Sequence, residues 1–354
     1  MNKSIQSPVV VIPNINGGDG LLRAVDSLVL QTTPLHIIIV DNASTDDSIQ
    51  NLLKKFPLIE IIKHSNNKGY AGGVNPGFKR ALELGASYTA PFNNDAVADP
   101  RWLERLVTFL DSHQDYGAAA SKVQDIKKNK LDSSGEFYSV WGLPYPRGRS
   151  NSNISRYDMD TEIFAASGAA SLYRTKTIAD VGLLDEDFFA YYEDVDLGFR
   201  MQLMGWKVGY VPQSVVYHAT GSTSSRIHGF TTLQTLKNQP LVLWKNVPTK
   251  YLWSVSWRFI IAHNLIFLRA IFSGNIKAAC TGYFKAAWLI LRKTSQRKSI
   301  QKRKRVSDDY IWSIMTHDLP PNATALRRLR SFWWRLIGRQ HNDQDVGTSK
   351  GSGL

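Results

Sequence analysis

The chain has 354 residues, of which 43% are hydrophobic and 21% are charged, which predicts a globular protein with a sizeable core and excludes a collagen-like or wholly disordered chain. Its single cysteine, Cys280, excludes an intrachain disulfide and a cysteine-rich zinc site. The formal net charge of +13 is concentrated between Lys250 and Gln340, where eighteen Lys and Arg residues stand against three acids, and this predicts an anionic partner for the C-terminal part.

The N-terminal part alternates between short apolar runs and segments in which apolar residues recur at helical spacing. The runs predict strands at 9–12, 36–40, 59–63 and 88–92, and the periodic segments predict helices at 21–28, 49–56, 74–84 and 102–110. Such alternation predicts an α/β fold with a Rossmann-like, mostly parallel sheet flanked by helices. Ligands of such sheets bind at the carboxyl ends of the strands.

Polar residues follow each predicted strand, at Pro13-Asn14, Asp41-Asn42, Asn66-Asn67 and Asn93-Asn94-Asp95. A carboxylate at Asp41 can accept the N3–H of a pyrimidine base. Asp95 can serve as a hard oxygen ligand for a metal ion that bridges two phosphates, although an Asx turn before the next helix explains the same residues. The glycines of GYAGG are better explained as turn and packing residues than as a phosphate loop.

Three carboxylates crowd together in the segment FFAYYEDVDLGFR, residues 188–200. Glu193, Asp194 and Asp196 fall on the first turn of a helix predicted over 193–204, where the helix dipole stabilises anions. One explanation is that these acids only cap a helix whose apolar residues pack on the core. Beside an aromatic shelf, however, one carboxylate could deprotonate a hydroxyl while another anchors the substrate.

The segment 125–161 is rich in Ser, Asn, Arg and Pro and has little periodicity, so we interpret it as an irregular excursion that could contact a second substrate. Its aromatic residues could stack on sugar faces or pack on the domain surface. Its arginines could contact an acceptor diphosphate or remain solvated. These residues are Trp141, Tyr145, Tyr157, Arg147 and Arg149.

The chain after residue 234 is predicted to be helical, with Trp and Phe interleaved with Lys and Arg. The apolar stretch 251–272 is interrupted by Arg258, His263 and Arg269, which favours a helix lying in a membrane interface over one that spans it. The run 297–305 would supply attraction to an anionic membrane. Nucleic acid is a less favoured partner because no recognised motif accompanies the charge. A homodimer interface is the structural alternative.

These patterns predict three regions, namely a catalytic domain at 1–240, a basic helical appendage at 241–340 that faces a membrane, and a disordered tail at 341–354. The first apolar run is stopped by Pro13 and is too short for a signal peptide. We therefore expect a cytoplasmic protein that is peripheral on the inner face of the cell membrane.

Seven segments occur in a familiar order: VVVIPN, IIIVDNASTD, NNKGYAGGVNPGF, FNND, FAASGAASLYR, FFAYYEDVDLGFRMQLMGWKV and VVYHATGS. Over about residues 8–240 this succession resembles the inverting family 2 glycosyltransferases, particularly their bacterial rhamnosyltransferase-like branch. The resemblance implies a GT-A fold, a nucleoside-diphosphate-sugar donor and a divalent cation, Mg²⁺ or Mn²⁺.

The resemblance also implies roles for individual residues. Asp194 matches the catalytic base, Asp95 the metal-binding acid of the DxD position, and His218 a histidine that completes the metal site. Asn93 stands where the family has its first acid, and Ile15 where it often has Tyr. Predicted donor-binding residues are Pro13, Asn14, Asn16, Asp41, Asn67, Asn75 and Asn94, and predicted acceptor-binding residues are Glu193, Asp196 and Trp141.

We therefore predict an inverting glycosyltransferase of cell-surface polysaccharide synthesis. Its expected donor is a dTDP-sugar, with L-rhamnose favoured, or a UDP-hexose, and its expected acceptor is a hydroxyl of a saccharide or of a polyprenyl-diphosphate-linked oligosaccharide. The alternative is a non-catalytic member that binds a nucleotide sugar or scaffolds a membrane complex, which the departures at Asn93 and Ile15 leave open. A sugar-phosphate nucleotidyltransferase is disfavoured because the loop after the first strand has no cation before Arg23.

Overall fold

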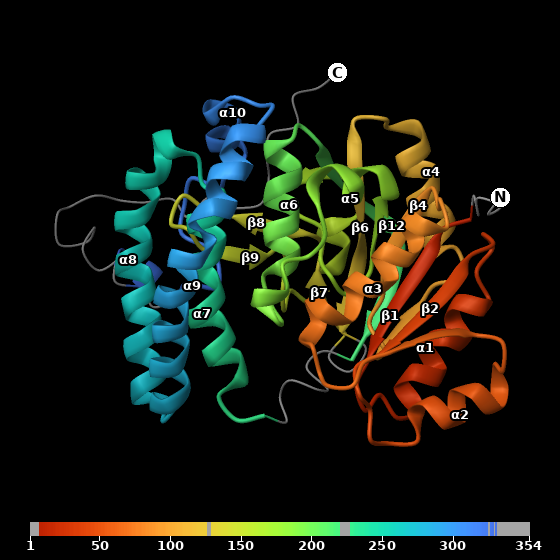
Figure 1. Cartoon of the computed structure of the whole chain (residues 1–354). Helices are drawn as coiled ribbons and strands as arrows, with labels where there is room; N and C mark the ends of the chain where they lie inside the picture. The colour runs from red at the N-terminus through yellow and green to blue at the C-terminus, as the bar shows by residue number, and fades with distance from the viewer. Residues whose placement is uncertain (1–6, 126–128, 220–226, 325, 329, 331–354) are drawn as a thin grey trace.

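The structure is a computed structural model that describes residues 7–125, 129–219, 227–324, 326–328 and 330. A mixed sheet of ten strands forms its centre, in the order β10-β12-β6-β11-β4-β1-β2-β3, with β5 paired to β12 and β7 paired to β6 (Figure 1). The predicted tail at 341–354 lies outside the described residues.

The first half of the sheet is parallel, as the sequence predicts. It consists of β1 (Val9–Asn14), β2 (His36–Asp41), β3 (Glu60–Lys63) and β4 (Tyr88–Pro91). Alternate residues of β1 point to opposite faces, so Val10 joins a core with α1, α2 and α4, while Val11 joins one with α3. Burial on both faces explains why these strands are continuous apolar runs. The four helices are α1 (Asp19–Val29), α2 (Ser48–Lys55), α3 (Gly69–Glu83) and α4 (Trp102–Ser112).

The second half of the sheet mixes both directions. Here β11 runs antiparallel to β4 and β6, whereas β6 and β12 are parallel. The strands are β5 (Ala96–Ala98), β6 (Tyr116–Asp125), β7 (Lys130–Ser133), β10 (Thr161–Ile163), β11 (Ser171–Arg174) and β12 (Lys207–His218). These strands continue the sheet sideways from β4, on the side away from β1.

Helix α3 begins at Gly69, five residues before its predicted start near Val74. Asn67 Oδ1 accepts a hydrogen bond from Gly69 N at 2.8 Å, and this Asx turn leads into the helix before the apolar period begins. A Cβ at Gly77 would overlap the Val11 side chain, and one at Gly73 would overlap Asn42. These glycines therefore let α3 approach β1 closely, in agreement with a packing role.

The segment predicted as an irregular excursion is more ordered than its sequence indicates. It contains β7, the two-stranded sheet of β8 (Glu136–Tyr138) and β9 (Pro144–Pro146), and the 3-10 helix η1 (Ile154–Tyr157). Tyr145 is buried, and Arg147 lies over the rings of Tyr157 and Tyr210 at 5.0 and 5.6 Å. These three predicted sugar or diphosphate contacts are thus packing residues. Strands of three residues are too short to reveal a period.

The segment around the carboxylates contains α5 (Thr175–Val181), the 3-10 helix η2 (Glu186–Phe188) and α6 (Glu193–Leu203). Helix α6 confirms the helix predicted at 193–204 to within one residue. The C-terminal helices are α7 (Phe230–Asn246), α8 (Thr249–Phe272), α9 (Ile276–Arg303) and α10 (Asp308–Ile314).

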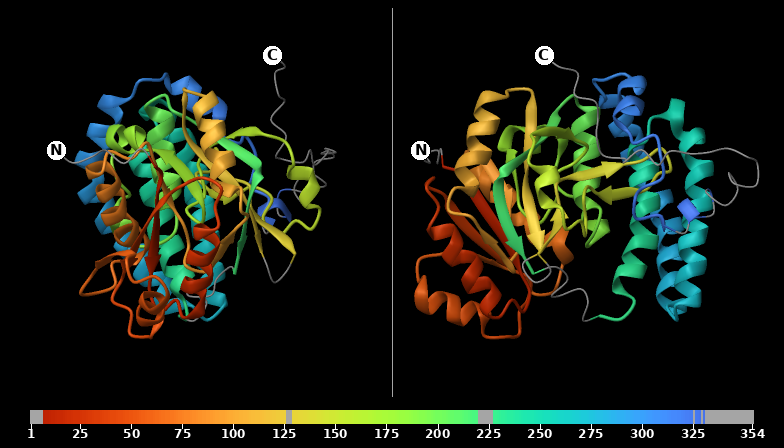
Figure 2. Two further views of the ribbon diagram at one scale, coloured as in Figure 1. Left: turned by 90° about the vertical axis from the view of Figure 1, so that its right-hand side faces the viewer. Right: turned by 180° about the vertical axis from the view of Figure 1, so that it is seen from behind.

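The C-terminal helices lie at the end of the molecule opposite β1, β2 and β3 (Figures 1 and 2). The predicted boundary between residues 240 and 241 falls inside α7. One apolar core joins Phe199 of α6 to Leu243 of α7, Phe259 of α8 and Leu289 of α9. The helical region is therefore built into the sheet domain through a common core.

Candidate active site

The ends of β1, β2 and β4 are tied together by one buried amide. Asn14 Nδ2 donates to Ser44 Oγ at 3.0 Å and to Ser48 Oγ at 3.1 Å, and Asn14 Oδ1 accepts from Asn94 Nδ2 at 2.8 Å. The predicted donor-binding residues Asn14 and Asn94 are thus brought into contact. They form the floor of the strand-end region, where the fold places ligands.

Two further predicted donor-binding residues hold the loop after β2. Asn16 Oδ1 accepts from Thr45 N at 2.8 Å, and Asp41 Oδ1 accepts from Ser44 N at 3.0 Å. Pro13, at the end of β1, lies against Gly73 of α3. This part of the strand-end region is consequently rigid before any ligand arrives.

Asn75 does not join this group. Its amide donates to Leu184 O at 2.9 Å and to Glu186 Oε1 at 2.9 Å, and its Oδ1 accepts from Leu184 N at 3.0 Å. The side chain is buried, so its polar atoms fasten α3 to the segment before η2. Asn75 therefore has a structural function, and the structure does not support its predicted contact with the donor.

Asp95 and His218 meet as the resemblance implies. His218 Nε2 lies 3.0 Å from Asp95 Oδ1 and 3.0 Å from Asn93 Nδ2, and His218 Nδ1 lies 3.0 Å from Asp132 Oδ2. Burial lowers the pKa of His218, but its bonds to Asp132 and Asp95 outweigh burial and raise that pKa to about 9. The imidazole is thus fixed between two carboxylates.

This arrangement fits a divalent cation in part. Asp95 supplies a hard oxygen, His218 supplies a nitrogen beside it once a cation displaces its proton, and Asp132 occupies the position of the outer carboxylate that orients a metal-binding histidine. Over the described ranges, no group of three or more His, Cys, Asp or Glu side chains could hold a metal ion by itself. The donor set therefore fits a cation whose remaining ligands come from a diphosphate and water.

Asp194 begins the second half of the site. Its Oδ2 accepts from Gly168 N at 2.9 Å, and its Oδ1 accepts from Val195 N at 2.8 Å. Burial raises the pKa of Asp194, and the two backbone hydrogen bonds partly offset that rise. Such a carboxylate has a fixed orientation and a higher proton affinity than an exposed one, as a general base requires.

A two-residue segment joins the halves of the site. Gly168 N binds the carboxylate of Asp194, and the next residue, Ala169, accepts through its carbonyl a 3.0 Å hydrogen bond from Asn93 N. The loop that carries Asp95 is therefore connected to the base candidate through adjacent residues of one backbone segment. Tyr70 of α3 also donates a hydrogen bond to Gly168 O.

The backbone leading into α6 is held in an unusual conformation. Phe189, Tyr191 and Tyr192 have φ values of 61°, 69° and 70°, a region of backbone conformation that residues other than glycine rarely adopt. Asn238 of α7 donates to Phe188 O at 2.9 Å, to Ala190 O at 2.8 Å and to Tyr191 O at 2.8 Å. Such strain persists only where its surroundings enforce it. Here α7 supplies that enforcement.

Sequence reasoning assigned no site role to Asp132 or Glu136. Burial and then the charge of Asp194 raise the pKa of Glu136 to about 8. Arg149 Nη2 lies 3.2 Å from Asp132 Oδ1, and its charge lowers the pKa of both Asp194 and Glu136. Arg149 thus belongs to the site, between the Asp194 side and the His218 side.

Glu193 and Asp196, the two acids on either side of Asp194 in the sequence, lie in different surroundings. Glu193 is buried, and its Oε2 has no hydrogen-bond partner within the described part of the chain. Burial, and then repulsion by Asp194, raise the pKa of Glu193 well above its usual range. A protonated Glu193 can donate a hydrogen bond to an acceptor oxygen, which is compatible with its predicted role.

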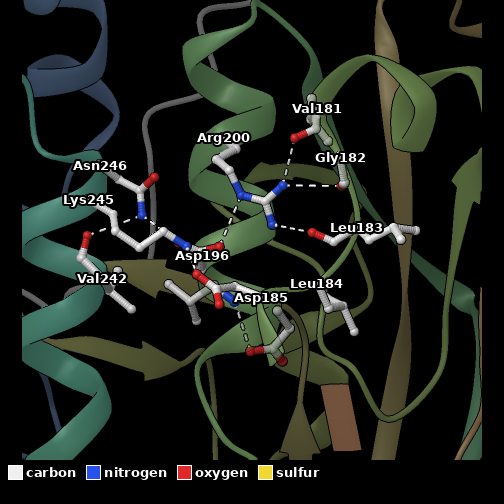
Figure 3. A network of polar contacts seen from close by, with 12 residues as sticks. Val181, Gly182, Leu183, Leu184, Asp185, Asp196, Arg200, Val242, Lys245 and Asn246 are labelled. Carbon is white, nitrogen blue, oxygen red and sulfur yellow. Dashed lines mark hydrogen bonds and ion pairs between the residues drawn. The ribbon is translucent and has the colours of Figure 1, made fainter. Parts of the chain in front are cut away.

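Asp196 lies in a buried network of ion pairs (Figure 3). Its Oδ1 contacts Lys245 Nζ and Asn246 Nδ2, each at 2.8 Å, and its Oδ2 accepts from Arg200 Nε at 3.0 Å. The side chain has no exposed surface. The predicted acceptor-binding role of Asp196 is therefore corrected, because all of its polar contacts are taken by the protein core.

Trp141 also has an internal partner. Its ring packs against Trp257 of α8, with ring centroids 6.3 Å apart, and it borders the core shared with the helical region. Trp141, a predicted acceptor-binding residue, therefore packs against α8 in the structure.

Several known proteins resemble this chain. Residues 9–182 match the sequence profile described as Glycosyl transferase family 2. The chain is 27% identical over 239 residues to N-acetylglucosaminyl-diphospho-decaprenol L-rhamnosyltransferase of Mycobacterium tuberculosis, covering 62% of this chain and 78% of that protein. It is 20% identical over 230 residues to dTDP-rhamnosyl transferase RfbF of Shigella flexneri, covering 65% of this chain and 73% of that protein.

A solved structure extends the similarity to the helical region. Mannosyltransferase PcManGT from Pyrobaculum calidifontis, in complex with GDP-Man and Mn²⁺, superimposes with a TM-score of 0.51 at 14% identity, covering 94% of this chain and 90% of that chain. At such identity the likeness shows the fold, which is the GT-A fold. The chain belongs to glycosyl transferase family 2, whose enzymes transfer a sugar from a nucleotide-sugar donor.

Proposed function

We propose that the protein is an inverting glycosyltransferase in which Asp194 is the general base. The observation that carries this proposal is the segment Gly168-Ala169, which binds the carboxylate of Asp194 on one side and the backbone of Asn93 on the other. It supports a single site in which a base and a diphosphate-binding loop face the same substrate.

Inverting transfer needs one proton acceptor on the acceptor side. The hydroxyl oxygen of the acceptor forms a bond to the anomeric carbon, the bond from that carbon to the diphosphate breaks, and the hydroxyl proton passes to Asp194. The diphosphate leaves with the electron pair of the broken bond. The elevated pKa of Asp194 favours this proton transfer, because burial makes its carboxylate a stronger base.

Asp95 and His218 would hold a Mg²⁺ or Mn²⁺ ion together with the diphosphate. A cation there would neutralise the charge of the leaving group. The chain's own contribution is to fix the two ligands: Asp132 orients the imidazole of His218 from behind, and the backbone of Ala169 holds the start of the 93–95 loop.

We further propose L-rhamnose as the sugar and a lipid-linked saccharide as the acceptor. The names of two relatives support this choice, since both are rhamnosyltransferases and one acts on an N-acetylglucosaminyl-diphospho-decaprenol. The preferred donor is accordingly a dTDP-sugar, with UDP-sugars next.

A panel of nucleotide sugars tests the proposal. Hydrolysis and transfer are measured for each sugar with and without Mn²⁺, for the wild type and for Asp194→Asn. We expect one sugar to be turned over by the wild type in a metal-dependent manner. Tight binding of a nucleotide sugar without turnover of any sugar would instead favour a non-catalytic binding protein.

A further inference from the structure

The outer faces of α8 and α9 expose large apolar side chains. Trp253, Phe272, Phe284 and Leu291 are 80%, 87%, 74% and 75% exposed. The other members of this surface, which we call the α8–α9 face, are Trp257, Ile260, Ile261, Leu268, Ile276, Tyr283 and Trp288. Successive members within each helix are one, three, four or seven positions apart, and these spacings place them on one side of the helix.

The opposite faces of the same helices are packed inside the protein. Val255 and Phe259 of α8 and Leu289 of α9 are buried in the core that also contains Phe199 of α6. The exposed stripe is therefore additional to what the fold requires. Exposed apolar surface of this extent in a soluble domain usually marks a binding surface.

The charged side chains carried by α8 and α9 themselves are all cationic. There is no Asp or Glu in the sequence between Asp196 and Asp308. The exposed cations of α8 and α9 include Arg269, Lys277, Lys285, Arg292, Lys298 and Lys302. Arg258 and Arg292 lie over the rings of Trp257 and Trp288, at 4.6 and 4.5 Å. Cations paired with indole rings suit a region where water, phosphate groups and acyl chains meet.

The predicted basic run 297–305 contributes less to this charge than its sequence indicates. Arg297 is buried and donates to the carbonyl oxygens of Trp244 and Val247. Arg305 pairs with Asp180 at 2.8 Å, and Lys304 pairs with Asp308. These three cations fasten α9 and its end to the protein, so they are not the ones to replace in a binding test.

We propose that the α8–α9 face docks on an anionic phospholipid bilayer and lies in its headgroup zone. Within the described ranges, α8 is the one helix that is long and apolar enough to cross a membrane by length and composition. A crossing would require lipid on all sides of α8, whereas Val255, Phe259 and Ala262 are buried against protein. Docking uses the apolar stripe for insertion and the surrounding cations for attraction to anionic lipid.

Flotation of the full chain with vesicles tests this docking. The vesicles contain either phosphatidylcholine alone or an equimolar mixture with phosphatidylglycerol, each at low and high salt. We expect binding to the anionic vesicles, weakened by salt. The triple variant Trp253→Ser, Phe284→Ser and Leu291→Ser should lose binding at both salt concentrations. The variant Arg269→Gln, Lys277→Gln and Lys298→Gln should lose about a hundredfold in partitioning, and only at low salt.

Matched controls come from exposed residues of the sheet domain. Leu30→Ser, Leu58→Ser and Met159→Ser control for the loss of exposed apolar side chains, and Lys54→Gln, Lys63→Gln and Lys79→Gln control for the loss of charge. Neither control should change partitioning. Because all the replaced side chains are exposed, thermal melting should confirm that each variant is folded.

Three results would overturn the proposal. They are negligible binding to both vesicle types, equal loss of binding in the controls, and retention of the wild type on membranes after extraction in alkaline carbonate, which would indicate that α8 spans the bilayer. Negligible vesicle binding together with a dimer in light scattering would assign the face to a second copy of the chain. Vesicle binding is measured without donor or acceptor, so its failure is distinguishable from failure of the proposed reaction.

Discussion

Lys245 Nζ lies 2.8 Å from Asp196 Oδ1, and neither side chain has any exposed surface. The same ammonium group lies 2.6 Å from Asp185 Oδ2, whose other oxygen is 2.7 Å from Lys293 Nζ of α9. Residues 185 and 196 bracket the segment that contains Asp194. Lys245 of α7 therefore clamps both ends of the segment that carries the base (Figure 3), and Lys293 of α9 clamps the end at Asp185.

Replacement of Lys245 should destabilise the whole protein. We expect Lys245→Met to lower the free energy of unfolding by about 3 kcal/mol, because it leaves buried carboxylates with fewer counter-charges while Arg200 and Lys293 remain. Lys250→Met is the control, since the pair of Lys250 with Asp309 is exposed and should contribute little to the free energy of unfolding. Urea denaturation measures both. Equal losses in the two variants would contradict the clamp.

Asp194→Asn should remove transfer and preserve donor binding. The amide has nearly the same size but cannot take a proton, and its NH₂ group cannot accept one of the two backbone hydrogen bonds, so we expect turnover to fall by about 10² to 10⁴. Calorimetry with the donor and a turnover assay separate the two effects. Asp196→Asn, two residues away, should instead lower stability, because Asp196 binds Lys245 and Arg200. A fully active Asp194→Asn enzyme would remove Asp194 from the role of base.

Asp132→Asn should weaken metal binding although Asp132 is not itself a proposed ligand. Loss of an outer carboxylate that orients a metal-binding histidine typically costs about 10- to 100-fold in affinity. Titration of Mn²⁺ in the presence of nucleoside diphosphate measures the change, and Asp26→Asn on the exposed surface is the control. We also expect excess chelator to abolish turnover. Unchanged Mn²⁺ affinity in Asp132→Asn would place the cation elsewhere.

The buried Glu136 should make stability depend on pH. Its folded-state pKa of about 8 exceeds the ordinary value of 4.5, so between these values the folded protein keeps a proton that the unfolded chain has lost. Stability is therefore greatest at low pH in this window and falls as pH rises from about 4.5 to 8. Each pKa unit corresponds to about 1.4 kcal/mol, so the loss amounts to several kcal/mol.

Glu136→Gln should flatten this part of the stability profile, whereas Glu83→Gln, on the exposed surface of α3, should leave it unchanged. Denaturation midpoints at a series of pH values between 5 and 8 provide the comparison. A wild-type profile that rises with pH over this window would show that Glu136 is ionised in the folded protein.

In the parallel half, β1 and β2 could be predicted because they are runs of β-branched residues, and the helices because each has its own apolar period. Asp194 could be predicted because it lies in a dense local motif. Asp132 could not, since it is an isolated acid in a strand of four residues. It reaches His218 only because β7 and β12 pair with opposite edges of β6, where Val123 faces both Ser133 and Val216.

Other parts of the site depend on pairs that are remote in sequence. Lys245 looks like one cation among many in a basic region, and nothing near it indicates that its partners are Asp185 and Asp196. The predicted boundary at residue 240 falls inside α7 for a similar reason, because the composition changes there while the helix continues. Periodicity describes the surface that an element buries, but it does not identify the element that covers it.

The clamp on Asp185 has a consequence for how the enzyme is made. Asp185 and Lys293 are separated by 108 positions. A ribosome adds about 5 to 20 residues per second, so roughly 5 to 20 seconds pass between synthesis of the aspartate and synthesis of the lysine that pairs with it. During that interval the strained turn before α6 has no complete support. A nascent chain released after His218 but before Lys293 would carry every residue of the proposed site and still lack these supporting contacts.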